Sequence, residues 1–171
     1  MLSRIHRYLI LFAAGVALGL AGCLLIPTVL VQAQAASGPA AKPSSPLDIV
    51  TADGKRHPFK VEVVSEPDER AVGLMFRRSL AADGGMLFDF GRTEPVAMWM
   101  KNTLIPLDML FIAHDGAVVN IAQRTVPGSL AAIPAAKPVR FVLEVAGGTA
   151  SRLGIKPGDK VIHPLFGNAG K

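Results

Sequence analysis

Cysteine, tryptophan and tyrosine occur only once each in this sequence of 171 residues. The single cysteine, Cys23, lies in an apolar N-terminal segment. The rest of the chain therefore has no disulfide, no thiol nucleophile and no cysteine-based zinc site. We expect that part of the chain to be held together by its hydrophobic core alone.

The motifs of several common catalytic and metal sites are also missing. His57, His114 and His163 do not show the i, i+4 spacing of a helical zinc site, and no G-x-S-x-G sequence of a serine hydrolase is present. Met98 and Met100 could act as soft copper ligands, but no histidine or cysteine accompanies them, which favours core packing. We expect no metal and no other cofactor.

The basic residues do not form a cluster. Arg4 and Arg7 lie near the N-terminus, and the residues after position 35 carry 16 Lys and Arg against 13 Asp and Glu. A protein that binds DNA or RNA usually shows a basic stripe, often with stacking aromatic side chains. The scattered charges therefore argue against nucleic-acid binding.

The N-terminal segment has the features of an export signal. Arg4 and Arg7 precede the uncharged, mostly apolar run 8–31, and residues 33–35 supply the small-x-small pattern that a signal peptidase recognises. We interpret residues 1–35 as a signal peptide or an N-terminal membrane anchor. The domain that follows is then periplasmic or secreted, and it contacts the membrane only through this segment.

Three fates of the segment stay open. The first is cleavage after Ala35 or Ala36. The second is retention as an anchor, since the apolar run exceeds the ~20 residues that span a bilayer. The third is lipidation of Cys23, because residues 20–23 resemble a lipoprotein signal, although apolar residues 24–26 follow directly.

Residues 36–46 are rich in Ala, Ser, Gly and Pro, a composition typical of a flexible linker. We therefore expect a single β-rich domain over residues 47–171. Within it, alternation of apolar residues in 59–64 and 139–145 predicts half-buried strands, and Asp-Gly pairs at 53–54 and 115–116 predict hairpin turns.

Other segments of the domain complete the pattern. Further strands are predicted at 47–51, 86–90, 97–101, 108–113, 117–125 and 160–163. Short helices are predicted near 66–75 and 149–153, and residues 126–138, rich in Ala and Pro, are expected to form a loop. About eight short strands with two minor helices predict a mainly β fold, either a jelly-roll-like sandwich or a partly closed barrel. A doubly wound α/β fold is disfavoured because its crossover helices are missing.

Several motifs follow one another along the chain: Glu69-Arg70, Gly73-Leu74-Met75 and Arg77; Gly85-Met86-Leu87-Phe88; Met98-Trp99-Met100-Lys101-Asn102-Thr103; Pro106-Leu107-Asp108 with Phe111-Ile112; Val142-Leu143-Glu144; Gly154-Ile155; and Gly158-Asp159. In this order they resemble the bacterial and archaeal Domain of Unknown Function 192 family. The resemblance covers residues 59–163, and the block from Trp99 to Asp108 is its most specific part.

This resemblance implies a mainly β, jelly-roll-like domain that often follows a signal peptide. It implies no activity, because the family has no established biochemical role. One departure is Phe141, which follows Arg140 where the family often has tyrosine. That difference removes one hydroxyl group as a candidate site atom.

Eight residues lie within otherwise apolar strands or at strand ends and form the candidate ligand-binding set: Arg70, Arg77, Trp99, Lys101, Asn102, Thr103, Asp108 and Glu144. Buried polar groups must be paired, so these residues either satisfy one another or point into a pocket. In the first interpretation, Arg70 or Lys101 pairs with Asp108 or Glu144 to lock a helix onto the sheet, and Trp99 belongs to the core.

In the second interpretation, Trp99 lines a cleft that binds a sugar-like or small polar ligand, and Lys101 or Arg70 holds a carboxylate or phosphate. We favour as function a non-catalytic module that binds a small polar molecule or an envelope component. One alternative is a small enzyme in which Asp108 and Glu144 act as an acid–base pair, as in glycoside hydrolysis. A protein-interaction scaffold is the other.

Overall fold

The structure is a computed structural model that describes residues 42–169. The predictions for residues 1–35, including lipidation of Cys23, lie outside the described residues. Among the residues that are described, no helix is both long and apolar enough to cross a membrane. The first strand begins at Ser44, so the end of the predicted linker 36–46 belongs to the sheet.

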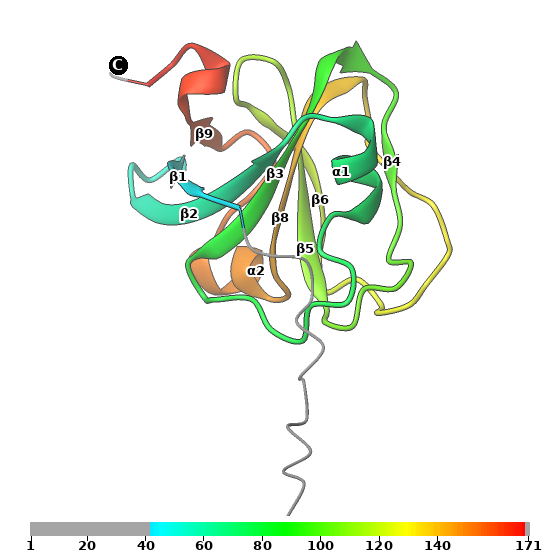
Figure 1. The fold of residues 1–171 in the computed structure, drawn as a ribbon. Helices are drawn as coiled ribbons and strands as arrows, with labels where there is room; N and C mark the ends of the chain where they lie inside the picture. Colours follow the sequence, from blue (N-terminus) through cyan, green and yellow to red (C-terminus); the bar gives the residue numbers. More distant parts are fainter. Residues whose placement is uncertain (1–41, 170–171) are drawn as a thin grey trace, which may run out of the picture. The chain divides into compact units, whose positions relative to one another are not determined.

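Seven strands form one curled sheet (Figure 1). Their order across the sheet is β6 (Val118–Ala122), β5 (Leu107–Ile112), β8 (Val139–Ala146), β3 (Gly84–Glu94), β2 (Arg56–Val64), β1 (Ser44–Val50) and β9 (Lys160–Ile162). The prediction of a mainly β fold is confirmed.

Strands β2 and β3 run parallel, whereas the other neighbouring pairs in this sheet are antiparallel. The connection between them contains the helix α1 (Pro67–Val72), so one crossover connection is present in this otherwise antiparallel sheet. Pro67 at the start of α1 and the acidic Asp68 and Glu69 suit its N-terminus. The helix ends at Val72, earlier than the sequence predicts, and the next residue, Gly73, has a backbone φ of 48°.

The remaining elements are small. The helix α2 (Thr149–Leu153) and the 3-10 helix η1 (Pro164–Phe166) flank β9. A separate two-stranded sheet pairs β4 (Ala97–Met98) with β7 (Ile133–Pro134). The strand β7 lies in the segment 126–138 that the sequence predicts as a loop.

The two edge strands of the large sheet meet at one end and partly close it into a barrel. Ala117, next to β6, forms a bridge with Lys160 of β9. The amide of Val161 donates to the carbonyl of Gly116 at 2.8 Å, and the amide of Val118 donates to the carbonyl of Asp159 at 2.9 Å. The partly closed barrel is therefore the better of the two predicted architectures.

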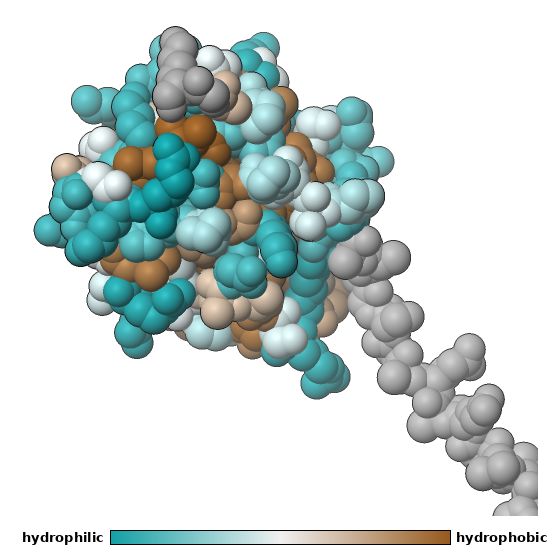
Figure 2. Space-filling model, turned by 90° about the vertical axis from the view of Figure 1, so that its left-hand side faces the viewer, coloured by the Kyte–Doolittle hydropathy of each residue, from teal (hydrophilic) through white to brown (hydrophobic). Residues whose placement is uncertain are grey.

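The sheet separates two hydrophobic cores. The inner core fills the barrel with residues such as Leu87, Leu110 and Leu143. The outer core lies between the convex face of the sheet and the segments that cover it, and it contains Phe88 and Phe111. Seen from the side of β1 and β9, hydrophilic residues cover most of the surface and hydrophobic residues form separate patches (Figure 2).

A glycine at the barrel closure provides a test of this architecture. Gly116 has a φ of 86°, and a Cβ atom there would collide with the carbonyl oxygen of Val161 and approach Asn168 Nδ2 to 2.8 Å. We predict that Gly116→Ala lowers the free energy of unfolding by about 2–4 kcal/mol, measured by urea denaturation. The control is Gly54→Ala. The φ of Gly54 is also positive, at 80°, but an added Cβ atom would have no neighbouring atom within 4 Å. The Gly54 substitution should therefore lower the free energy of unfolding by only about 1 kcal/mol. Equal costs would show that the closure contributes little.

Candidate functional site

The central strand β8 places its residues alternately in the two cores. Leu143 and Val145 point into the barrel, whereas Val142 points into the outer core. Glu144 lies opposite Met86 of β3 and Met109 of β5, and both of these methionines belong to the outer core. The pleat therefore directs the Glu144 carboxyl group into an apolar region under the covering segments.

Glu144 is buried without a partner. The residue is 4% exposed, and its carboxyl group makes no hydrogen bond or ion pair with any of the residues that the structure describes. Burial raises the pKa of Glu144 to about 8. At neutral pH the carboxyl group is thus mostly protonated, and its O–H can donate a hydrogen bond.

The carboxyl group faces a small cavity of about 20 Å³. Arg70 and Gly73 from the region of α1, Trp99, Lys101 and Thr103 also line this cavity. Its size is sufficient for about one water molecule or one oxygen atom of a ligand. We call it the inner cavity.

A larger groove of about 410 Å³ adjoins the inner cavity, and we call it the outer groove. It runs between α1 and the segment of β4, and the two spaces share five lining residues: Arg70, Ala71, Phe88, Met98 and Trp99. The other walls are mostly apolar and come from β3 and the loop before β7, including Phe90 and Leu130. The arrangement is a mainly apolar groove with a single buried carboxyl group beneath it.

Trp99 forms one wall of this groove and is 46% exposed, so it is not a core residue. The ammonium group of Lys101 lies 5.1 Å from the centre of the Trp99 ring, within the range of a cation–π contact. Thr103 is buried, and its hydroxyl donates to the Lys101 carbonyl at 3.3 Å. These three residues follow one another closely in the chain and face the same cavity.

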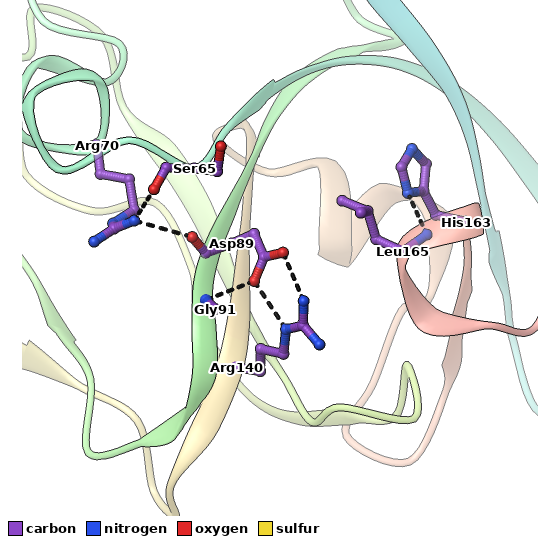
Figure 3. A network of polar contacts seen from close by, with 7 residues as sticks. All are labelled: Ser65, Arg70, Asp89, Gly91, Arg140, His163 and Leu165. Carbon is purple, nitrogen blue, oxygen red and sulfur yellow. Dashed lines mark hydrogen bonds and ion pairs between the residues drawn. The ribbon is translucent and has the colours of Figure 1, made fainter.

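Arg70 is held in place by backbone carbonyl groups (Figure 3). Its guanidinium donates to Ser65 and, at 3.1 Å, to Asp89, and it lies 5.1 Å from the centre of the Phe90 ring. The Asp89 carboxylate accepts two hydrogen bonds of 2.9 Å from Arg140 and one from the Gly91 amide. Burial alone would raise the pKa of Asp89, but these hydrogen bonds outweigh it and lower the pKa. The network fixes the Arg70 guanidinium at the wall of the groove.

Asp108 lies outside the groove and connects separate parts of the backbone. It lies opposite Val145 on β8, so its side chain is on the barrel side of the sheet and Glu144 is on the outer side. Its carboxylate accepts hydrogen bonds from the amides of Arg124 (2.7 Å), Gly148 (2.9 Å) and Ala150 (2.7 Å). Asp108 therefore ties β5 to the first turn of α2. The two carboxyl groups lie on opposite sides of the sheet, so Asp108 does not share a site with Glu144, as the alternative of an acid–base pair requires.

Two other predicted residues also lie outside the inner cavity and the outer groove. Arg77 forms a two-pronged ion pair with Glu62, which lowers the pKa of the Glu62 carboxyl group. Asn102 adopts a left-handed conformation (φ 55°), and its carbonyl accepts a hydrogen bond from the Phe76 amide. Asn102 lines a third hollow of about 580 Å³, which shares Lys101 and Thr103 with the inner cavity and Leu130 with the outer groove.

The first interpretation of the polar set is not supported either, because neither Arg70 nor Lys101 pairs with Asp108 or Glu144 among the described residues. Leu130, which lines the outer groove, lies in the predicted loop and was not among the candidate residues. The signal in the sequence was a large apolar residue within a loop rich in alanine and proline. No group of three His, Cys, Asp or Glu residues suited to hold a metal ion occurs in the described part of the chain.

Comparison with known proteins gives one family match. The model of the family named DUF192 and described as "Uncharacterized ACR" matches residues 48–163. The chain belongs to this family. The resemblance seen in the sequence motifs is thereby confirmed, and Arg70, Trp99, Lys101, Thr103 and Glu144 all lie within the matched region.

Two of the crystal structures that are similar to this DUF192 chain show the level of similarity. A proposed transcription regulator from Sinorhizobium meliloti is 48% identical with a TM-score of 0.72, and the match covers 75% of this chain and 99% of that one. A protein of unknown function from Novosphingobium aromaticivorans is 43% identical with a TM-score of 0.69, covering 75% and 94%. No curated protein is similar to the chain.

The burial of Glu144 predicts a characteristic dependence of stability on pH. The folded protein holds this proton more tightly than the unfolded chain, so the stability contributed by the protonated form is lost as pH rises from about 5 to about 8. We predict that Glu144→Gln removes this loss. The free energy of unfolding of the variant minus that of the wild type should therefore increase by up to about 1.4 kcal/mol per pH unit over this range. The exposed Glu66→Gln serves as control, and parallel pH curves for all three proteins would contradict the prediction.

The structural role of Asp108 predicts a loss of stability on substitution. Asp108→Asn keeps the shape of the side chain but replaces one accepting oxygen by an amide donor that faces backbone N–H groups. We expect a loss of about 2–3 kcal/mol in the free energy of unfolding by urea denaturation. Asp83→Asn changes an exposed carboxylate 4.0 Å from Lys60 and should cost less than about 1 kcal/mol. If Asp108→Asn lowered the free energy of unfolding as little as this control does, Asp108 would not have the proposed structural role.

Proposed function

We propose that the domain binds a small organic molecule in the outer groove. An apolar face of the ligand packs against Trp99, and one polar group of the ligand points toward Glu144. The observation that carries this proposal is the buried carboxyl group of Glu144, unpaired among the described residues, in an inner cavity that shares Arg70 and the half-exposed Trp99 with the groove.

A comparison with Asp108 supports a binding role for Glu144. Asp108, on the neighbouring strand, accepts three hydrogen bonds from backbone amides. Glu144 has no such partner among the described residues, and it lines the inner cavity. A ligand in that cavity would supply the hydrogen bond that the protein does not, as is typical of polar groups in binding pockets.

Binding is favoured over catalysis because the second carboxylate of the expected acid–base pair is absent from the groove. Asp108 lies on the opposite face of the sheet and is saturated by backbone amides. Among the residues that line the groove and the inner cavity, Glu144 is the one acid. A single protonated carboxyl group suits the recognition of a ligand.

The relative described as a transcription regulator raises the possibility of DNA binding, which the charges of this chain do not favour. Several basic residues are paired with acids, including Arg56 with Asp48 and Lys160 with Asp115. Such pairing reduces the positive potential that a phosphate backbone would require. We further propose that the domain acts outside the cytoplasm, because the apolar segment and the small residues at 33–35 have the features of an export signal.

The chain contains one tryptophan, so its fluorescence reports directly on the proposed site. We predict that a screen of organic acids, sugars, sugar phosphates and amines identifies compounds that change this fluorescence and raise the melting temperature. Trp99→Leu should weaken binding of a hit by about tenfold in calorimetry while the fold is retained.

The matched control is Phe76→Leu, since Phe76 is also exposed and aromatic but lies outside the groove. This variant should bind the hit as the wild type does. A hit that Trp99→Leu binds with unchanged affinity would place the binding site elsewhere, and a screen without hits would favour the scaffold hypothesis.

A further inference from the structure

We infer that the ligand is a small organic acid whose carboxylate enters the inner cavity and accepts a hydrogen bond from Glu144, while its apolar body lies in the outer groove. This inference rests on the proposed binding function and specifies the class of ligand. It depends on three features: the charges around the groove, the size of the inner cavity and the apolar nature of the groove walls.

The charged residues that line the inner cavity favour an anion. The helix α1 contributes Arg70 and the segment after β4 contributes Lys101, whereas the neighbouring strands β3 and β5 contribute the uncharged Met86, Phe88 and Met109. Two cations therefore line the inner cavity together with one carboxyl group. A bound carboxylate would be attracted by both cations and would accept a charge-assisted hydrogen bond from the protonated carboxyl group of Glu144.

An amine ligand fits less well. It would have to ionise Glu144 and place its own positive charge beside Arg70 and Lys101, which costs electrostatic energy in a region of low dielectric constant. The protonated state of Glu144, which results from burial, suits an acceptor on the ligand.

The sizes of the inner cavity and the outer groove restrict the class of ligand further. The inner cavity of about 20 Å³ admits about one oxygen atom, which matches an edge of a carboxylate better than a bulky phosphate. The outer groove has room for the body of the ligand, but most of its walls carry no hydrogen-bonding side chain. A sugar would leave several hydroxyl groups without partners there, whereas an aromatic or aliphatic chain would not.

Three probes with the same body test this inference: phenylacetate, phenylacetamide and 2-phenylethylamine. Each is titrated into the full chain at neutral pH and followed by calorimetry and by tryptophan fluorescence. We expect phenylacetate to bind in the ~mM range, as befits so small a molecule, and at least about tenfold more tightly than the amide or the amine. Because binding requires the protonated form of Glu144, the affinity should fall by up to tenfold per pH unit above about pH 8.

Variants of the charged residues separate the roles of proton and charge. Glu144→Gln keeps a neutral hydrogen-bond donor, so it should bind phenylacetate within about threefold of the wild type and lose the pH dependence. Lys101→Met should weaken binding of the acid by about fivefold to tenfold and leave the amide unaffected. The exposed Lys156→Met is the control and should change neither. Thermal unfolding verifies that each variant is folded.

Each contrary result has a defined meaning. Preferential binding of the amine, or equal binding of acid and amide, would overturn the acid class and leave the proposed binding function standing. The same holds if none of the three probes binds but another compound of the broader screen does so at Trp99. If no compound in either experiment binds, the inference and the proposed function both fail.

Discussion

Both faces of β8 are buried, and this constraint determines where each side chain in the centre of the sheet can go. Inward residues such as Leu143 fill the barrel, and outward residues such as Val142 require a second apolar layer above them. Leu74, which follows α1, and Met98 and Ile133 of the small sheet belong to that layer. A groove remains between α1 and β4, and Glu144 lies below it because the pleat of β8 allows it no other direction.

The two buried carboxyl groups on neighbouring strands show how similar side chains acquire different roles. Asp108 is surrounded by amides that donate to it, so its burial joins separate parts of the chain. Glu144 has no donor among the described residues, and burial keeps it protonated instead. Asp108 thus accepts hydrogen bonds within the protein, whereas Glu144 is able to donate a hydrogen bond to a bound molecule. The arginine network around Asp89 fixes the wall beside the second acid.

Much of the fold could be predicted from the sequence because alternation and turn residues are local signals. The alternation in 139–145 and the turn at 115–116 correspond to β8 and to the β5–β6 hairpin. The parallel pairing of β2 with β3 could not be predicted, since it depends on how a short helix packs over the sheet. The separation of Asp108 from Glu144 depends on the register between β5 and β8, which local patterns do not contain. Leu130 reaches the groove only because a long loop folds back over the outer core.

The pairing of β1 with β9 has a consequence for how this domain folds. These strands lie far apart in the sequence, and Asp48 pairs with Ile162. Among the seven strands of this sheet β9 comes last in the chain, so β1 keeps one unpaired edge until β9 has reached it. Contacts between residues so distant in sequence form slowly, and an open edge in the meantime can pair with another chain. The three residues of β9 therefore decide when the folding domain ceases to be prone to aggregation.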